Sequence, residues 1–274
     1  CRVPGNAFPV FFSACYNISM SFARVFSAQP DVLAGTIVPV EFDIARGINA
    51  FSVVGLADRA VDEAKDRVGA ALKNAGFESP KHKNQKTVVS LAPADLKKEG
   101  PYFDLAIAVG YLLASEDLNF NPEKKIFIGE LSLNGDVKKV RGILPITKTA
   151  LIEGFTEIIL TKENAEEAAL VRGISVYPVE NIADLIEHLH ETKLKRKDGG
   201  AGEMVLKKEI MPQPPTEINF TNRTSNIDMR DVRGQEGAKR GMEIAAAGRH
   251  NIALFGPPGT GKTMLARSFV GILP

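Results

Sequence analysis

The sequence has few of the residues that stabilise secreted or membrane-spanning proteins. Its 274 residues include no tryptophan and two cysteines, Cys1 and Cys15, so the body of the chain carries no disulfide framework. Such a chain is typical of the reducing cytosol. No apolar run reaches the roughly 18 residues that a membrane span needs. We therefore expect a cytoplasmic protein with no membrane partner.

An excess of charge of one sign is also missing. With 34 Lys and Arg against 33 Asp and Glu, the net charge is +1, so no whole-molecule field attracts nucleic acid. Hydrophobic residues at 44% and charged residues at 24% exclude a disordered or collagen-like chain. Nucleic-acid binding would need a local patch. Phosphate contact is one interpretation of two groups of basic residues, and solvated loops are the other: Lys81, His82, Lys83 and Lys86, then Lys97 and Lys98.

Alternating strand-like and helix-like segments between Met20 and His190 predict an α/β (α+β) domain without internal repeats. Strands are expected at 35–44, 50–55, 87–92, 125–130, 157–160 and 175–178. Helices are expected at 59–75, 103–114, 146–153, 164–171 and 182–190, the first with Asp58 as N-cap and Gly76 as its stop. Asn134 and Gly135 predict a hairpin.

The remaining segments differ in composition. We interpret residues 1–19 as a non-native or disordered extension, because strand-like alternation begins after Met20. Residues 191–226 are rich in Lys, Gly and Pro, which predicts a linker whose basic cluster is solvated or contacts phosphate. A second domain is expected at 227–274.

The second domain contains the sequence G-P-P-G-T-G-K-T, which matches the phosphate-binding loop pattern. An expected strand at 251–255 precedes it, and an expected helix at 264–270 follows it. Glycines let backbone N–H groups approach phosphate oxygens, while the lysine and the hydroxyl serve the β- and γ-phosphates and Mg²⁺. The predicted ATP site comprises Gly256, Pro257, Pro258, Gly259, Thr260, Gly261, Lys262 and Thr263, with Thr263 as the Mg²⁺ ligand.

Hydrolysis requires more than this loop. An acidic residue from a later strand and usually an arginine from a neighbouring subunit complete the machinery. Because the chain ends at Pro274, we expect no catalytic residue in it and no nucleotide turnover. The four histidines, His82, His188, His190 and His250, lack ligand spacing with Cys or carboxylates, so no further metal site is expected.

The run D-V-R-G-Q-E-G-A-K-R-G-M-E-I-A-A-A-G-R-H-N-I-A-L-F-G-P-P-G-T-G-K-T-M-L-A-R resembles the magnesium-chelatase-like branch of AAA+ ATPases, in particular the bacterial ComM/YifB group. V-V-G-L-A-D at 53–58, F-D-L-A-I-A at 103–108 and G-E-L-S-L-N-G-D-V at 129–137 extend this likeness to the first domain. The resemblance implies a domain with the Lon-protease-like fold, also seen in a ribosomal protein, followed by a truncated AAA+ segment. It places Val232, Gly234 and Gln235 beside adenine, and it implies a parent hexameric motor that branch-migrates DNA during natural competence.

Three functions compete with a DNA motor. A Lon-like fold suggests a serine-lysine protease as one alternative. The segment K-E-G-P-Y-F-D, however, places Tyr102 or Phe103 near the serine position, and Leu144 and Pro145 stand where the lysine is expected. The group usually has Ser-Ala where this chain has Pro101 and Tyr102. A second possibility is a chelatase subunit that remodels a partner during magnesium insertion into a porphyrin. The third is a stand-alone binding or assembly module.

Overall fold

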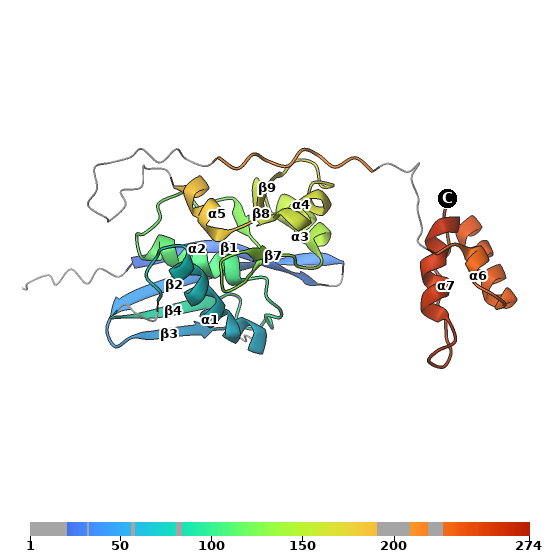
Figure 1. The fold of residues 1–274 in the computed structure, drawn as a ribbon, viewed down its shortest axis with the longest axis horizontal. Coiled ribbons are helices and arrows are strands. Elements are labelled where there is room, and N and C mark those ends of the chain that lie inside the picture. Colours follow the sequence, from blue (N-terminus) through green and yellow to red (C-terminus); the bar gives the residue numbers. More distant parts are fainter. Residues whose placement is uncertain (1–20, 32, 56–57, 81–83, 191–208, 219–226) are drawn as a thin grey trace, which may run out of the picture. The chain divides into compact units, whose positions relative to one another are not determined.

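The structure is a computed structural model that describes residues 21–31, 33–55, 58–80, 84–190, 209–218 and 227–274. Contacts divide the chain into two compact units, Cys1–Thr216 and Glu217–Pro274, and each is described by itself (Figure 1). The mixed α/β class predicted from the sequence is confirmed. The domain limits drawn from composition stay a prediction.

The first unit is built on a seven-stranded mixed sheet of order β3-β4-β2-β1-β5-β8-β9. A long antiparallel hairpin pairs β1 with β2, and β4 runs antiparallel to β2, while the other neighbours are parallel. A second sheet holds β6 and β7. The bounds are β1 Ser21–Asp31, β2 Ala34–Arg46, β3 Ala50–Val54, β4 Gln85–Leu91, β5 Lys125–Phe127, β6 Glu130–Leu131, β7 Val137–Lys138, β8 Glu157–Thr161 and β9 Ser175–Val179.

Helices cover both faces of this sheet, as a mixed sheet with parallel strands requires. They are α1 Arg59–Asn74, α2 Asp104–Ala114, α3 Ile143–Ile152, α4 Lys162–Ala168 and α5 Ile182–Leu189. Successive strand residues point to opposite faces, so Phe127 and Ile159 join the cluster packed by α1, α2 and α5. Ile126 and Ile158 join the cluster packed by α3 and α4. The hydrophobic core therefore lies in two layers.

Local sequence signals set several element ends. Asp58 caps α1 by accepting a hydrogen bond from the Val61 N–H at 2.9 Å, and Gly76 follows the helix at φ 87°, as predicted. The predicted strand at 125–130 is wrong as one element. It divides into β5 and β6, because the Gly129 N–H donates to the carbonyl of Tyr102 instead of continuing the ladder with β8.

Part of the expected linker packs on the first unit as an extended strap, residues 209–216 (Figure 1, orange). The Ile210 N–H donates to Nδ1 of His188 at 3.1 Å, and the Gln213 N–H donates to the Val176 carbonyl of β9 at 2.8 Å. Thr216 donates from its N–H and hydroxyl to carbonyls in and just after α4, at 3.0 and 2.7 Å. The strap thus covers the free edge of β9. The other predicted linker residues, 191–208 and 219–226, and the predicted extension 1–19 lie outside the described residues.

The second unit contains the short helix η1 Met229–Asp231, the helices α6 Glu236–Gly248 and α7 Lys262–Phe269, and the final turn η2 Val270–Ile272. Its small core is formed by Val232, Met242 and Leu265. The predicted strand at 251–255 is wrong: these residues form no ladder. A strand needs a paired neighbour, and residues 227–274 include none. Across the described part of the chain, no helix is long and apolar enough to cross a membrane.

Candidate functional site: the phosphate loop

The glycine-rich loop leads directly into α7, which begins at Lys262, two residues earlier than predicted. Gly259 and Gly261 both have φ of 82°, in the left-handed region. No atom lies within 4 Å of the position that a Cβ would take at either residue. Backbone conformation, and not lack of space, therefore requires glycine at these two positions.

The Lys262 side chain hydrogen-bonds back to the loop that precedes it. Its Nζ donates to the carbonyl oxygens of Gly256 and Pro257 at 2.8 and 2.6 Å, and it lies 3.4 Å from Oγ1 of Thr260. Thr260 in turn donates its hydroxyl proton to the Pro257 carbonyl at 2.9 Å. The structure thus brings the lysine, the threonine and the first loop residues together, with the ammonium group at the centre of the loop.

The start of α7 favours an anion. Gly261 is its N-cap and offers no side-chain hydrogen bond, and the first turn holds no acidic residue. The first N–H groups of a helix lack intrahelical partners and carry the positive end of its dipole. Together with the Lys262 ammonium and the exposed Thr263 hydroxyl, they form a donor set that fits a nucleotide phosphate with its Mg²⁺ ion.

The residues that the resemblance placed beside adenine lie in different environments. Val232 is 6% exposed and packs with Met242 and with Leu265 of α7, so it is a core residue of this unit. Gly234 and Gln235 are exposed and both left-handed, at φ 68° and 61°, and they lead into α6. Their roles toward adenine stay predictions.

The basic patches are only partly as expected. Lys81, His82 and Lys83 lie outside the described residues, while Lys86 and Lys97 are exposed. Both interpretations, phosphate contact and a solvated loop, are wrong for Lys98, because its side chain is buried and its ammonium donates to the carbonyl of Pro93. Burial lowers the pKa of Lys98.

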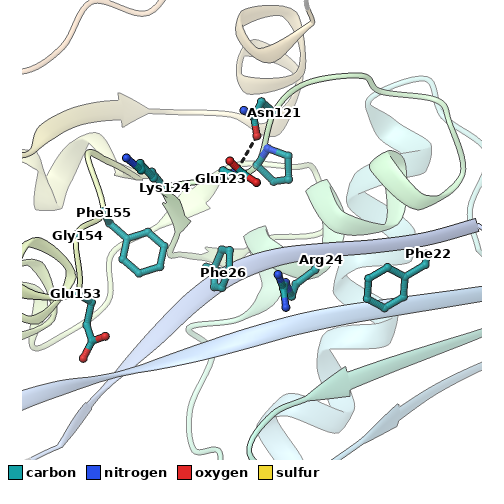
Figure 2. A pocket seen from close by; sticks show the side chains of 10 residues that line it. Phe22, Arg24, Phe26, Asn121, Glu123, Lys124, Glu153, Gly154 and Phe155 are labelled. Carbon is teal, nitrogen blue, oxygen red and sulfur yellow. Dashed lines mark hydrogen bonds between the residues drawn. The ribbon is translucent and has the colours of Figure 1, made fainter.

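Sequence reasoning missed a groove of about 490 Å³ in the first unit (Figure 2). Its floor is the start of β1, and its walls are the turn before β5 and the turn after α3. The alternation of Phe22, Arg24 and Phe26 in β1 was the available signal, because residues two apart share one face of a strand. The lining residues are Phe22, Arg24, Phe26, Asn121, Pro122, Glu123, Lys124, Glu153, Gly154 and Phe155.

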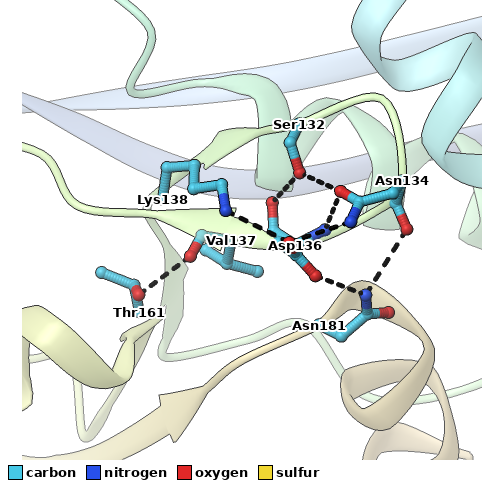
Figure 3. Close-up of polar contacts among 7 residues, drawn as sticks. All are labelled: Ser132, Asn134, Asp136, Val137, Lys138, Thr161 and Asn181. Atoms are coloured by element: carbon cyan, nitrogen blue, oxygen red, sulfur yellow. Dashed lines mark hydrogen bonds and ion pairs between the residues drawn. The ribbon is translucent and has the colours of Figure 1, made fainter.

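The predicted hairpin forms between β6 and β7, around a five-residue loop at 132–136 (Figure 3). The Asp136 carboxylate accepts hydrogen bonds from Asn134 at 3.0 Å, from Asn181 at 3.1 Å and from Lys138 at 3.1 Å. These hydrogen bonds lower the pKa of Asp136, and the bond from Asn134 has the largest effect. The motif G-E-L-S-L-N-G-D-V therefore builds a fixed corner that joins the hairpin to the start of α5.

The F-D-L motif serves the packing of α2. Asp104 is buried and forms a bidentate ion pair with Arg67 of α1, at 2.6 and 3.0 Å, and it accepts the N–H of Leu131 at 3.1 Å. Burial raises the pKa of Asp104, and the hydrogen bond to its carboxylate raises the pKa of Arg67. One carboxylate thus joins α1, α2 and β6.

Comparison with known proteins identifies the family. The family model for subunit ChlI of Mg-chelatase matches residues 40–164, and that for magnesium chelatase, subunit ChlI, matches residues 228–274. The competence protein ComM of Haemophilus influenzae is 39% identical over 93% of this chain, and YifB of Escherichia coli is 38% identical over 86%. The chain belongs to the magnesium-chelatase-like ComM/YifB family.

Membership of the ComM/YifB family makes the chain a member of an AAA+ ATPase family. The chain spans 47% of the length of the Haemophilus protein and 43% of the Escherichia protein. A shorter match, 32% identical over 34% of this chain, is to the DNA repair protein RadA of Streptococcus pneumoniae.

Proposed function

We propose that this chain binds Mg-ATP at Gly256–Thr263 as part of a cytoplasmic AAA+ ATPase that remodels DNA. The observation that carries the proposal is the geometry of the loop. Lys262, the first residue of α7, donates hydrogen bonds to the carbonyls of Gly256 and Pro257, and the start of α7 has no side-chain cap. Backbone N–H groups and the Lys262 ammonium would hold the β- and γ-phosphates, and the Thr263 hydroxyl would be a ligand of Mg²⁺. Val232, Gly234 and Gln235 would border the adenine.

Binding and hydrolysis are separate in this proposal. Hydrolysis needs a carboxylate from a second strand to position Mg²⁺ and water. Residues 227–274 contain no strand in the structure. We therefore expect the 274-residue chain to bind nucleotide without turning it over, and we assign turnover to a longer protein that assembles as a hexameric ring.

The Mg²⁺ ligand gives a direct test of the site. ATP affinity of the full chain is measured by titration calorimetry with Mg²⁺ and with EDTA, for the natural sequence and for Thr263→Val. We expect Mg²⁺ to strengthen ATP binding several-fold in the natural sequence and not in the variant, because valine keeps the shape and removes the ligand oxygen. Equal Mg²⁺ dependence in both proteins would contradict the assignment.

DNA is the proposed substrate because one relative is named a competence protein and another a DNA repair protein. The test is strand exchange on a branched DNA junction by the full-length protein, with Lys262→Ala as the inactive control. We expect ATP-dependent branch migration that the substitution abolishes. Junctions that remain unchanged with active ATPase would contradict DNA remodelling.

A magnesium-chelatase subunit is the second candidate, favoured by the description of the matching family models. Titration of the full-length protein with a porphyrin and its chelatase partners separates the two. ATP-dependent magnesium insertion would support the chelatase, and its absence together with branch migration would support the DNA motor. Proteolysis is not proposed, because Tyr102 or the buried Phe103 stands near the expected serine position.

A further inference from the structure

The first strand presents an uncovered aromatic and cationic face. Ala23 and Val25 of β1 are buried in the core beneath α2, whereas Phe22 is 66% exposed and Arg24 is exposed on the opposite face. On that face α3 packs near the other end of the β1–β2 hairpin, where Gly35 approaches Ile146. Among the described residues none covers the start of β1, which forms the floor of the groove in Figure 2.

Two of the three aromatic rings of the groove contact each other. Phe26 and Phe155 meet edge to face, with ring centres 5.2 Å apart. The guanidinium carbon of Arg24 lies 5.7 Å from the centre of the Phe26 ring. Phe22 is next along the same face and has a free ring surface (Figure 2). The floor therefore offers a planar cation between two aromatic rings, which is a surface for stacking flat groups.

The rim of the groove combines both signs of charge. Arg24 and Lys124 are exposed, and no ion pair joins either of them to a carboxylate of the described residues. Glu123 and Glu153 lie on the same rim. In the strand register of the hairpin, the partly buried Glu41 and Asp43 of β2 lie opposite Arg24 and Phe22, respectively.

These groups together select the ligand. A ligand that fits has anionic groups for the two cations, a flat ring for the aromatic floor, and N–H donors for the rim carboxylates. Nucleotides carry all three. A basic peptide would leave Arg24 and Lys124 without a partner. A run of acidic residues would supply anionic groups but no flat ring for the aromatic floor and no N–H donors in a ring plane for the rim carboxylates.

We propose that this groove binds single-stranded nucleic acid, with a base stacked on Phe22 and Arg24 and phosphates held by Arg24 and Lys124. Duplexes are excluded, since their bases are already stacked and paired. Exposed aromatics on a sheet face are a general means of binding unpaired bases. The inference goes beyond the proposed function, because it requires no nucleotide at the phosphate loop.

The test is fluorescence anisotropy of labelled 12-nucleotide DNA and RNA strands with the full chain, in EDTA and without ATP. Base stacking on an aromatic side chain contributes about 5- to 150-fold to affinity. We expect Phe22→Ala to weaken binding at least fivefold and Phe22→Trp to retain it. Leu133→Ala, which alters an exposed apolar side chain on the β6–β7 hairpin, is the matched control and leaves affinity unchanged.

Salt dependence tests the phosphate contacts. Two contacts to a single strand give a slope of log K against log salt of about −1.4, and one contact gives about −0.7. We expect Arg24→Ala to move the slope from the first value toward the second, and Arg172→Ala, a control at another exposed cation, to leave it unchanged.

Three outcomes would overturn the groove assignment: no binding of single strands, equal binding of a 12-base-pair duplex, or the same affinity in Phe22→Ala and Arg24→Ala as in the natural sequence. The variant Lys262→Ala separates failure of the groove proposal from failure of the proposed ATP site. It removes a group proposed for ATP binding and leaves binding at the groove unchanged.

Discussion

At the scale of the residue, the Asp104–Arg67 pair is a largely buried ion pair whose loss we expect to destabilise the fold. The Asp104 carboxylate is 1% exposed, so its two bonds to Arg67 are screened from water. Removing one partner of a buried pair costs about 3 kcal/mol, because the other charge is left without compensation. We expect Asp104→Asn to lower the free energy of unfolding of the first unit by about that amount, measured by urea denaturation.

The control for this substitution is Lys162→Ala. Lys162 and Glu180 also lie 2.6 Å apart, but their side chains are 69% and 64% exposed. Exposed pairs contribute about 0–1 kcal/mol, so we expect less than about 1 kcal/mol for this change. Equal effects of the two substitutions would contradict the role given to burial.

Asp136 gives a prediction for pH. Hydrogen bonds from Asn134, Asn181 and Lys138 lower its pKa below the ordinary 3.8, so the folded corner favours the carboxylate. This contribution to stability is fully present above pH 3.8 and is lost as pH falls toward the lowered pKa. A carboxyl NMR titration should give a midpoint below 3.8 for Asp136. A midpoint at or above that value would contradict the network.

Residues differ in how far the sequence predicts them. Asp58 and Gly76 were predictable, because helix ends demand particular residue types. Lys98 was not, since its loop has no periodicity that separates buried from exposed positions. Its burial depends on Pro93, which supplies the carbonyl that accepts its ammonium hydrogen bond.

At the scale of the element, the strap 209–216 covers the edge of β9 and is hydrogen-bonded to α5, to β9 and to the end of α4. We expect replacement of these residues by a Gly/Ser sequence of equal length to expose the β9 edge. The three prolines that keep the strap extended are lost, so the backbone bond from residue 213 to β9 is no longer held in place. Hydrogen exchange should then become faster at the N–H groups of β9 and at strap position 213, whose N–H donates to the Val176 carbonyl.

The matched control for the strap is Met211→Ser, because the Met211 side chain is 72% exposed. It should leave exchange at β9 unchanged. Exchange at β9 that is the same in the Gly/Ser protein and the natural sequence would contradict the role of the strap.

Elements with a regular hydrophobic period and a neighbouring element to pack against could be predicted from the sequence. The extended strap and the segment 251–255 could not. β2, which contains the expected strand at 35–44, alternates buried and more exposed residues, and α1 repeats apolar residues at helical spacing. The strap is rich in proline and has no such period, so its composition predicted a linker. The expected strand at 251–255 has an apolar pattern but no neighbour to pair with in residues 227–274.

At the scale of the whole molecule, the chain combines an α/β unit with its own two-layered core and a smaller unit that carries the phosphate loop. The family could be predicted from the sequence, because it depends on short motifs with fixed spacing. The groove of the first unit could not, because it joins β1 to turns about 100 and 130 residues further along the chain.

We propose that Lys262 belongs to an ATP site. The direct test is the dissociation constant of Mg-ATP for the full chain, compared with that for Lys262→Ala. Lys239→Ala, which removes another cation of the same unit in an ion pair with Glu236, is the control. A charge-assisted bond of about 1.5–3 kcal/mol predicts a loss of affinity of at least tenfold in Lys262→Ala and less than about twofold in Lys239→Ala. Equal affinity of Lys262→Ala and the natural sequence would contradict the account.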